Sequence, residues 1–235
     1  MPFFLKHRNE ALVEWMDRED CDEELLNNTY SQFTTINKLL SGWAKIYREM
    51  IHPILKQNPG ETTYILDIGC GGGDIIRLLD GLIKKDGFEA KLTGIDTDER
   101  SIRFLQNRDH PENITFRNIT SGELAEERTE FDIVISNHLI HHLSENNLRS
   151  VCHDAETLAK SLTIFSDIER SDIGYASFGL IAPLLFRSSY IVADGLISIK
   201  KSYRKKELQQ ILPSGWVVTR KFPFRLLATY QPESL

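Results

Sequence analysis

The segment Asp67-Ile-Gly-Cys-Gly-Gly-Gly73 combines an acid with glycines at alternate positions. It follows an apolar run over residues 64–68 and precedes a helical pattern over residues 75–83. Glycines at such a turn let a ligand touch the backbone, and the N-terminus of the following helix offers free N–H groups with a partial positive charge. The segment therefore predicts a ligand-binding loop between a buried strand and a helix.

The spacing of this loop also indicates which ligand it holds. A dinucleotide-binding loop reads G-x-G-x-x-G, with an acid about 20 residues further on. Here position 74 is Asp, and the third glycine, Gly73, comes one residue early. An aspartate beside a pyrophosphate is repulsive. The next strand-terminal acid, Asp96, lies farther along than that pattern requires, and it either accepts two ribose hydroxyls or caps the following helix. A ligand with a ribose but no phosphate fits best.

Three histidines, His138, His141 and His142, follow the apolar run 131–135. Histidine titrates near neutrality and is suited to be a general base. His141 and His142 are therefore candidate catalytic residues, and packing or helix entry is the alternative role. A metal site that includes His153 is disfavoured, because no carboxylate stands at a matching spacing. We predict no metal.

The elements that position these residues alternate along the chain. Buried strands are expected at 64–68, 92–95, 114–116, 131–135 and 162–165, and helices at 75–83, 100–107 and 144–160. Strands that alternate with helices form right-handed βαβ units, and such units build a parallel sheet covered on both faces. Residues 1–57 are predicted helical, and 170–200 are predicted to form helices over the carboxyl edge of the sheet. A helix at 205–212 and two antiparallel strands at 216–220 and 224–230 complete the chain.

The predicted fold class is α/β, with a doubly wound, seven-stranded, mostly parallel sheet whose last strand is antiparallel. We divide the chain into four parts: an N-terminal helical cap at 1–60, a ligand-binding core at 61–169, a substrate-pocket insertion at 170–200, and a C-terminal helix with two strands at 201–235.

Over residues 62–168 the sequence resembles the class I (Rossmann-like) S-adenosylmethionine (SAM)-dependent methyltransferases, whose loop is an acid-x-G-x-G-x-G. The motif order, with Asp96 and the strand 131–137 in register, carries the resemblance. It implies that SAM is the cofactor, that Asp96 binds its ribose, and that Thr97 is a further cofactor contact. The Gly-Asp-Ala that often meets the adenine is absent, so backbone groups of Ile119 and Thr120 are expected to substitute. The other implied cofactor contacts are Asp67, Gly69, Cys70, Gly71, Gly73, Asn137 and His138.

Residues 28–50 look like the N-terminal helices of quinone-biosynthesis methyltransferases, which close over SAM. By that resemblance Tyr30, Asn37 and Arg48 contact the methionine carboxylate or the acceptor. An amphipathic packing helix is the alternative. The apolar segment 170–200 predicts an apolar or aromatic acceptor. The substrate-binding candidates are Tyr30, Trp43, Arg170, Tyr175, Arg187 and Tyr190.

Composition narrows the function. The net charge of -6 disfavours a protein that works by neutralising phosphates, so no nucleic-acid partner is expected. The three cysteines, Cys21, Cys70 and Cys152, contain no CxxC pair, and we find no signal peptide and no apolar run of about 20 residues. The cytoplasm is therefore the expected compartment. The basic residues around 200–206 form either a solvated helix start or a peripheral contact with an anionic membrane.

We predict an enzyme that methylates a small apolar or aromatic acceptor, most simply a phenol or quinol hydroxyl. A phenol needs no strong base, because its acidity is intrinsic. The alternatives are a nucleic-acid or protein methyltransferase, a SAM-binding module without turnover, and an NAD-dependent oxidoreductase. The segment 136–139 lacks the Pro-Pro of amino-methylating enzymes, which argues against the first. Methylation at oxygen rather than carbon or nitrogen, and the oligomeric state, stay open.

Overall fold

The computed structural model describes residues 3–232 and contains one seven-stranded sheet in the order β3-β2-β1-β4-β5-β7-β6. Strands β1 to β5 are parallel, and β7 pairs antiparallel with both β5 and β6. The predicted α/β fold with an antiparallel last strand is therefore confirmed. The strands are β1 Thr63–Ile68, β2 Ala90–Asp96, β3 Ile114–Asn118, β4 Phe131–Asn137, β5 Ala159–Ile168, β6 Val217–Lys221 and β7 Arg225–Tyr230.

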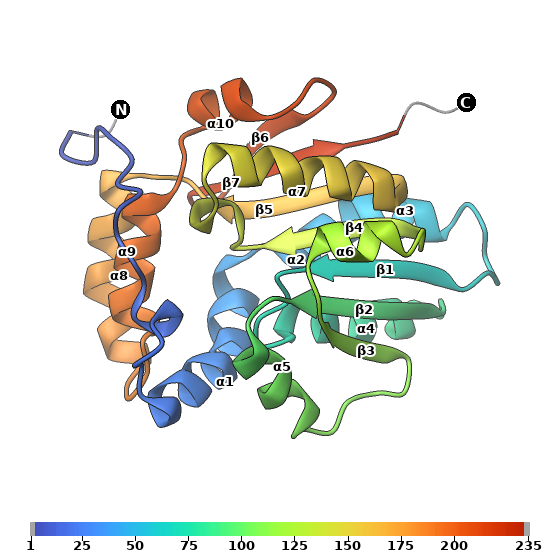
Figure 1. Ribbon diagram of the computed structural model, residues 1–235, viewed down its shortest axis with the longest axis horizontal. Helices are drawn as coiled ribbons and strands as arrows, with labels where there is room; N and C mark the ends of the chain where they lie inside the picture. Colours follow the sequence, from blue (N-terminus) through green and yellow to red (C-terminus); the bar gives the residue numbers. More distant parts are fainter. Residues whose placement is uncertain (1–2, 233–235) are drawn as a thin grey trace.

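Helices cover both faces of the sheet (Figure 1). Alternate strand residues point to opposite faces, so Ile65 and Leu92 pack in one apolar cluster and Leu66 and Ile95 in another. The first cluster takes in α4 (Asp74–Lys85) and α5 (Glu99–Gln106), and the second takes in α6 (Ser121–Glu126), α7 (Glu145–Leu158) and α10 (Lys205–Ile211). Helix α6 was not predicted from the sequence, because its six residues are too few to show a helical period.

The N-terminal part differs from the prediction. Residues 1–57 were expected to be helical, yet residues 3–22 are irregular apart from the 3-10 turn η1 (Trp15–Asp17), and they run beside α9 (Figure 1). We call residues 3–22 the strap. The reason is local, because acids outside the strap accept its backbone N–H groups in place of helical carbonyls. Regular helix begins only at α1 (Glu23–Leu40), which Asp22 caps, and continues through α2 (Trp43–Ile46), the π-helical η2 (Tyr47–Ile51) and α3 (His52–Leu55).

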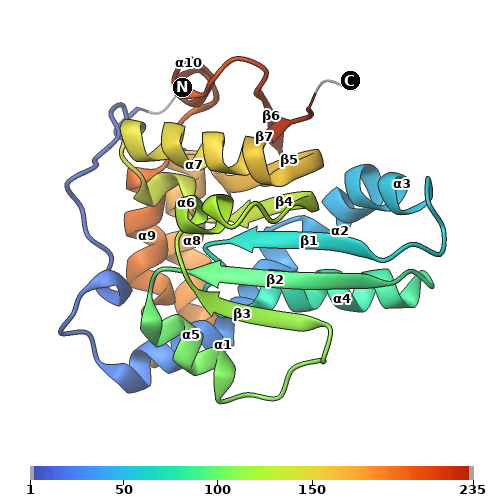
Figure 2. The same cartoon turned by 45° about the vertical axis from the view of Figure 1, so that its right-hand side comes forward.

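The carboxyl edge of the sheet is enclosed by helices, as predicted for residues 170–200. Helices α8 (Asp172–Leu185) and α9 (Ile191–Lys201) lie side by side at the ends to which the parallel strands point, with α1 beneath them (Figures 1 and 2). Ligands of open α/β sheets bind at this edge. Among residues 3–232, no helix combines the length and apolarity that a bilayer crossing needs.

Candidate functional site

A cavity of about 1170 Å³ lies at the carboxyl edge of the sheet, and its walls come from every part of the chain that encloses this edge. The floor is the glycine loop and the ends of β2 and β4. The strap, α1, α8 and α9 form the other walls. The cavity brings together most of the predicted cofactor residues: Asp67, Gly69, Cys70, Gly71, Asp96, Thr97, Ile119, Thr120, Asn137 and His138, together with Tyr30, Asn37, His141 and His142.

The glycine loop has a backbone that requires glycine. Gly69, Gly71 and Gly73 all have positive φ, which side chains disfavour. At Gly73 a Cβ would also lie 2.8 Å from Leu105. Gly73 therefore shapes the loop from below and does not line the cavity. The thiol of Cys70 packs in the core, so this residue presents its backbone to a ligand.

Three acids, Asp67, Asp74 and Asp96, surround the loop. Burial raises the pKa of all three, and the neighbouring acids raise the pKa of Asp67 further. The pKa of Asp74 reaches about 6 even though Asn37 donates a hydrogen bond to it at 2.9 Å. The Oδ1 atom of Asp67 is buried without a hydrogen-bond partner within residues 3–232. This end of the cavity suits a ligand that carries positive charge, and a pyrophosphate would be repelled.

Asp96 does not cap the following helix. The N-cap of α5 is Asp98, which accepts from Arg100 N. The carboxylate of Asp96 accepts from Gly71 N at 2.8 Å and from Asp98 N at 2.9 Å. Each carboxylate oxygen has a second lone pair. Asp96 is therefore held rigidly at the cavity wall with acceptor capacity left for hydroxyl groups.

At the proposed adenine end, Thr120 caps α6 through a capping box with Glu123. Its N–H donates to Glu123 Oε2 at 2.9 Å, so this N–H is already used. Ile119 also lines the cavity. Of the two backbone groups expected to replace the missing aspartate, Ile119 is the better candidate.

His141 is buried between two carboxylates. Its Nδ1 lies 2.7 Å from Asp167 Oδ1 and its Nε2 lies 3.3 Å from Glu14 Oε1, and its backbone N–H donates to Asp167. Burial opposes the charged form, but these two acids outweigh it and raise the pKa of His141 to about 9. The ring is protonated at neutral pH. It therefore has no free lone pair, and this argues against His141 as the general base.

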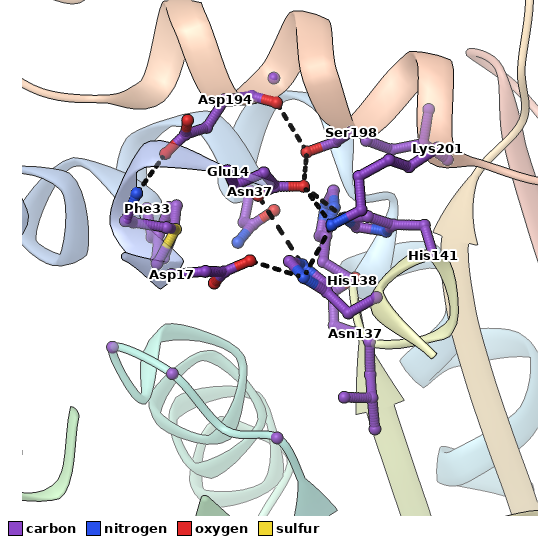
Figure 3. A pocket seen from close by; sticks show the side chains of 18 of the residues that line it. Glu14, Asp17, Phe33, Asn37, Asn137, His138, His141, Asp194, Ser198 and Lys201 are labelled. Atoms are coloured by element: carbon purple, nitrogen blue, oxygen red, sulfur yellow. Dashed lines mark hydrogen bonds and ion pairs between the residues drawn. The ribbon is translucent and has the colours of Figure 1, made fainter. Parts of the chain in front are cut away.

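His142 stands at the boundary between cavity and solvent, with its side chain 27% exposed. Its Nδ1 lies 3.1 Å from Asp17 Oδ2 and 3.4 Å from Lys201 Nζ. Figure 3 shows the surroundings, in which Glu14 of the strap meets Ser198 and Lys201 of α9. Burial opposes ionisation of Glu14, yet the hydrogen bond and charge of the neighbouring histidines, with Lys201, lower its pKa to about 2.

His138 ends β4 in a left-handed conformation, with φ 64°. Its Nε2 accepts from Arg225 Nη1 at 2.7 Å. The other terminal nitrogen, Nη2, donates to Asn137 Oδ1 at 2.6 Å and to Ser166 Oγ at 2.8 Å. Burial and the charge of Arg225 hold the pKa of His138 well below its usual value, so the ring is neutral.

Several predicted residues do not line the cavity. Arg48 is exposed on η2, so a cofactor contact by Arg48 is not supported. Trp43 is buried behind the wall, where Nε1 donates to Asn137 at 3.0 Å. Arg170 is buried, where it donates to the backbone carbonyls of Leu5 in the strap and of Ser202 just after α9, and it pairs with Glu207.

The remaining substrate candidates are also structural or exposed. Tyr175 packs edge-to-face with Phe4 of the strap, Tyr190 accepts from Asp22 N, and Arg187 is exposed. Neither these three residues, nor Trp43, nor Arg170 contacts the cavity. Among the substrate candidates, only Tyr30 lies at its wall.

The sequence analysis missed the residues that surround the histidines. Glu14 and Asp17 lie in the irregular strap, which shows no sequence period. Asp167 did carry a signal, because it ends a buried strand as Asp67 and Asp96 do. Arg225 carried one as well, as a cation entering an apolar strand. No carboxylate stands at a matching sequence spacing, but Glu14 and Asp167, from other parts of the chain, both contact His141. That no metal binds stays a prediction.

Residues 65–161 match the model of a family described as a methyltransferase domain. With the sheet order and the acid–glycine loop, this match confirms the resemblance of this part of the chain to class I (Rossmann-like) SAM-dependent methyltransferases.

Among curated relatives, the mitochondrial ubiquinone biosynthesis O-methyltransferase of Arabidopsis thaliana is 30% identical over 125 residues, which are 51% of this chain and 36% of the relative. The ubiquinone biosynthesis O-methyltransferase of Rhizobium etli is 33% identical over 92 residues, 38% of this chain and 35% of the relative. The matches thus cover about a third of the length of these relatives.

Solved structures share the fold. The plantazolicin methyltransferase BpumL, solved in complex with SAH, has a TM-score of 0.58 at 14% identity over 88% of this chain and 95% of its own. The CurJ carbon methyltransferase has a TM-score of 0.58 at 15% identity over 93% of this chain and 63% of its own.

Proposed function

We propose that this protein is a SAM-dependent methyltransferase that transfers a methyl group to the oxygen of a small apolar or aromatic acceptor, a phenol or quinol. One observation carries the proposal. The acid–glycine loop and Asp96 line the same cavity as the apolar faces of α8 and α9. A donor site and an acceptor site therefore share one enclosed space. The names of the curated relatives support methylation at oxygen.

The residues present fit SAM, which supplies a methyl group on a positively charged sulfur. The ammonium group of its methionine half suits the nearby Asp74 and the Oδ1 atom of Asp67, which is buried and has no partner in the part of the chain that the structure describes. Asp96 has acceptor capacity for two ribose hydroxyls. Ile119 lines the cavity at the expected adenine end. Asp74 disfavours a diphosphate, so a dinucleotide fits less well.

The cavity also has room and chemistry for an acceptor. Its volume of about 1170 Å³ exceeds the roughly 300–1,000 Å³ of a usual single-ligand pocket. The apolar part of the wall contains Phe33 and Ile36 of α1 and Phe178 of α8, and these pack on the buried cluster of Ala182, Phe186 and Ile191. An apolar or aromatic acceptor suits this wall.

His142 is the better of the two candidate bases. The carboxylate of Asp17, 3.1 Å from its Nδ1, orients the ring at the cavity wall. His141 is already protonated and acts instead as a fixed positive charge. A phenol loses its proton readily enough that removal of His142 slows transfer without abolishing it.

The test is a methyl-transfer screen with radiolabelled SAM over phenols, quinols and alkylated pyrones, run beside Asp96→Ala as a cofactor-site control. Transfer to at least one phenol or quinol, identified as an ether by mass spectrometry, is expected. Transfer only to nucleic acid or protein would contradict the proposal, as would SAM binding with no transfer to any phenol.

The three cysteines are all free, which supports the proposal of a reducing, cytoplasmic setting.

A further inference from the structure

Arg225 is a buried cation that has no anionic hydrogen-bond partner among residues 3–232. Its side chain is almost fully enclosed, 4% of the residue being exposed, and it lines the cavity. Its three hydrogen bonds go to His138, Asn137 and Ser166, all uncharged. Its Nε is buried with no partner within residues 3–232. A buried charge is costly unless an opposite charge compensates it. The nearby Asp167 compensates only in part, because it already bonds His141.

The contact with Arg225 also fixes the tautomer of His138. A guanidinium has no lone pair and can only donate, so Nε2 of the neutral His138 ring is the acceptor at 2.7 Å. The proton of the ring is then on Nδ1. That atom has no hydrogen bond within the described residues and is not among their buried unpartnered atoms, while His138 lines the cavity. The Nδ1–H group is therefore a donor that no described residue uses, on a side chain that lines the cavity.

The backbone of His138 adopts a strained conformation that supports this placement. His138 has φ 64°, a left-handed value that a non-glycine residue seldom adopts. Its N–H bonds to Ser166 O at 2.9 Å, which holds the residue at the end of β4. Strained residues of this kind cluster at ligand sites, where the surrounding structure overdetermines them. The groups around the His138 ring are Arg225 on β7, Asp167 on β5, His141 on η3 and Glu14 of the strap.

We propose that His138, positioned by Arg225, binds the acceptor oxygen in its anionic form, so that the enzyme selects hydroxyl groups that are acidic enough to be phenolates in the site. This rests on the proposed function. The phenolate oxygen accepts from His138 Nδ1–H and forms a bond to the methyl carbon. The carbon–sulfur bond breaks, and its electron pair stays on sulfur, which becomes neutral. The hydroxyl proton has left earlier, to solvent or to His142, so no proton moves in the transfer step itself.

The test measures the pKa of 4-nitrophenol bound to the full chain saturated with SAH, from the absorbance of the phenolate. SAH lacks the sulfonium charge, so the shift reports the protein alone. The wild-type protein is expected to bind the phenolate at least tenfold more tightly than the phenol. The pKa of the bound probe then lies at least about one unit below that of the free probe.

Three variants separate this role from a structural one. His138→Gly removes the donor without backbone strain and should return the probe pKa to nearly its free value. His138→Asn tolerates the left-handed backbone and keeps an N–H near the Nδ1 position, so part of the shift should remain. Arg225→Lys keeps the charge but loses the fork of donors, and should reduce the shift. His153→Ala, on exposed α7 surface, is the control and should match wild type.

SAH affinity, measured first by calorimetry, distinguishes the two proposals. Failure of the wild-type protein to bind SAH would contradict the proposed function. Normal SAH binding with an unshifted probe in wild type, or with the full shift kept in His138→Gly, overturns the role of His138.

Discussion

At the scale of single residues, we propose that cofactor recognition depends most on Asp96. Asp96→Ala should weaken SAH binding at least about tenfold, because hydrogen bonds to a charged acceptor contribute about 1.5–3 kcal/mol. The loss also frees Gly71 N, which Asp96 now holds at 2.8 Å. Titration calorimetry is the measurement, with Asp109→Ala on the exposed surface as the control. An unchanged affinity in Asp96→Ala would show that the ribose lies elsewhere.

Because of His141, the folded protein should lose stability as the pH rises into the alkaline range. Its pKa is raised from 6.5 to about 9, so the folded state binds a proton that the unfolded state has lost. The stabilisation is complete below about pH 6.5 and is lost as pH rises through about 9. Its size is on the order of 3 kcal/mol.

Urea unfolding between pH 6 and pH 10 measures this effect. The unfolding free energy of wild type should fall between pH 7 and pH 10, and His141→Gln should be less stable at pH 6 and lack most of that fall. Glu14 affects stability at acid pH instead. Its pKa is lowered to about 2, so its contribution to the unfolding free energy is lost as the pH falls toward that value. Parallel alkaline curves for wild type and His141→Gln would refute the assignment.

The strap forms one wall of the cavity, and the middle of the strap is held in place by Asp194 of α9. Its carboxylate accepts from Trp15 N at 2.7 Å and from Met16 N at 3.0 Å. Asp194→Ala should release this turn. Amide hydrogen exchange at residues 15–16 should then speed up at least about tenfold, since each lost charge-assisted bond contributes about 1.5 kcal/mol or more.

A matched control lies at the other end of the strap, where Asp172 accepts from Phe4 N and Leu5 N outside the cavity wall. Asp172→Ala should speed exchange only near residues 3–5. SAH should bind more weakly to Asp194→Ala and normally to Asp172→Ala. Equal exchange of residues 15–16 in all three proteins would mean that Asp194 does not hold the strap.

Elements whose apolar residues recur with a clear helical or strand period were predictable from the sequence, and elements without such a period were not. The parallel strands and α4 show apolar patterns that local physics dictates, and the helix expected at 144–160 is α7, which Ser144 caps. The strap has no such pattern, because acids on α8 and α9 fix it through tertiary contacts. For the same reason Glu14 and Asp17 could not be predicted as neighbours of the histidines. The charge state of His141 likewise follows from contacts between distant segments.

At the scale of the whole molecule, the fold brings a cation-attracting floor and an apolar wall to one cavity. The floor comes from the glycine loop, whose residues are consecutive and therefore predictable. The wall comes from α1, α8 and α9, whose apolar residues predicted the character of the acceptor but not which polar side chains face it. Arg170 and Tyr190 illustrate this, because their polar groups hold the strap instead.

The central claim is that this cavity binds SAM and not a dinucleotide. Titration calorimetry of the purified wild-type protein with SAM, SAH and NAD tests it most directly. We predict saturable binding of one SAM or SAH per chain and no measurable binding of NAD at the same concentrations. Binding of NAD without binding of either sulfur ligand would contradict the account.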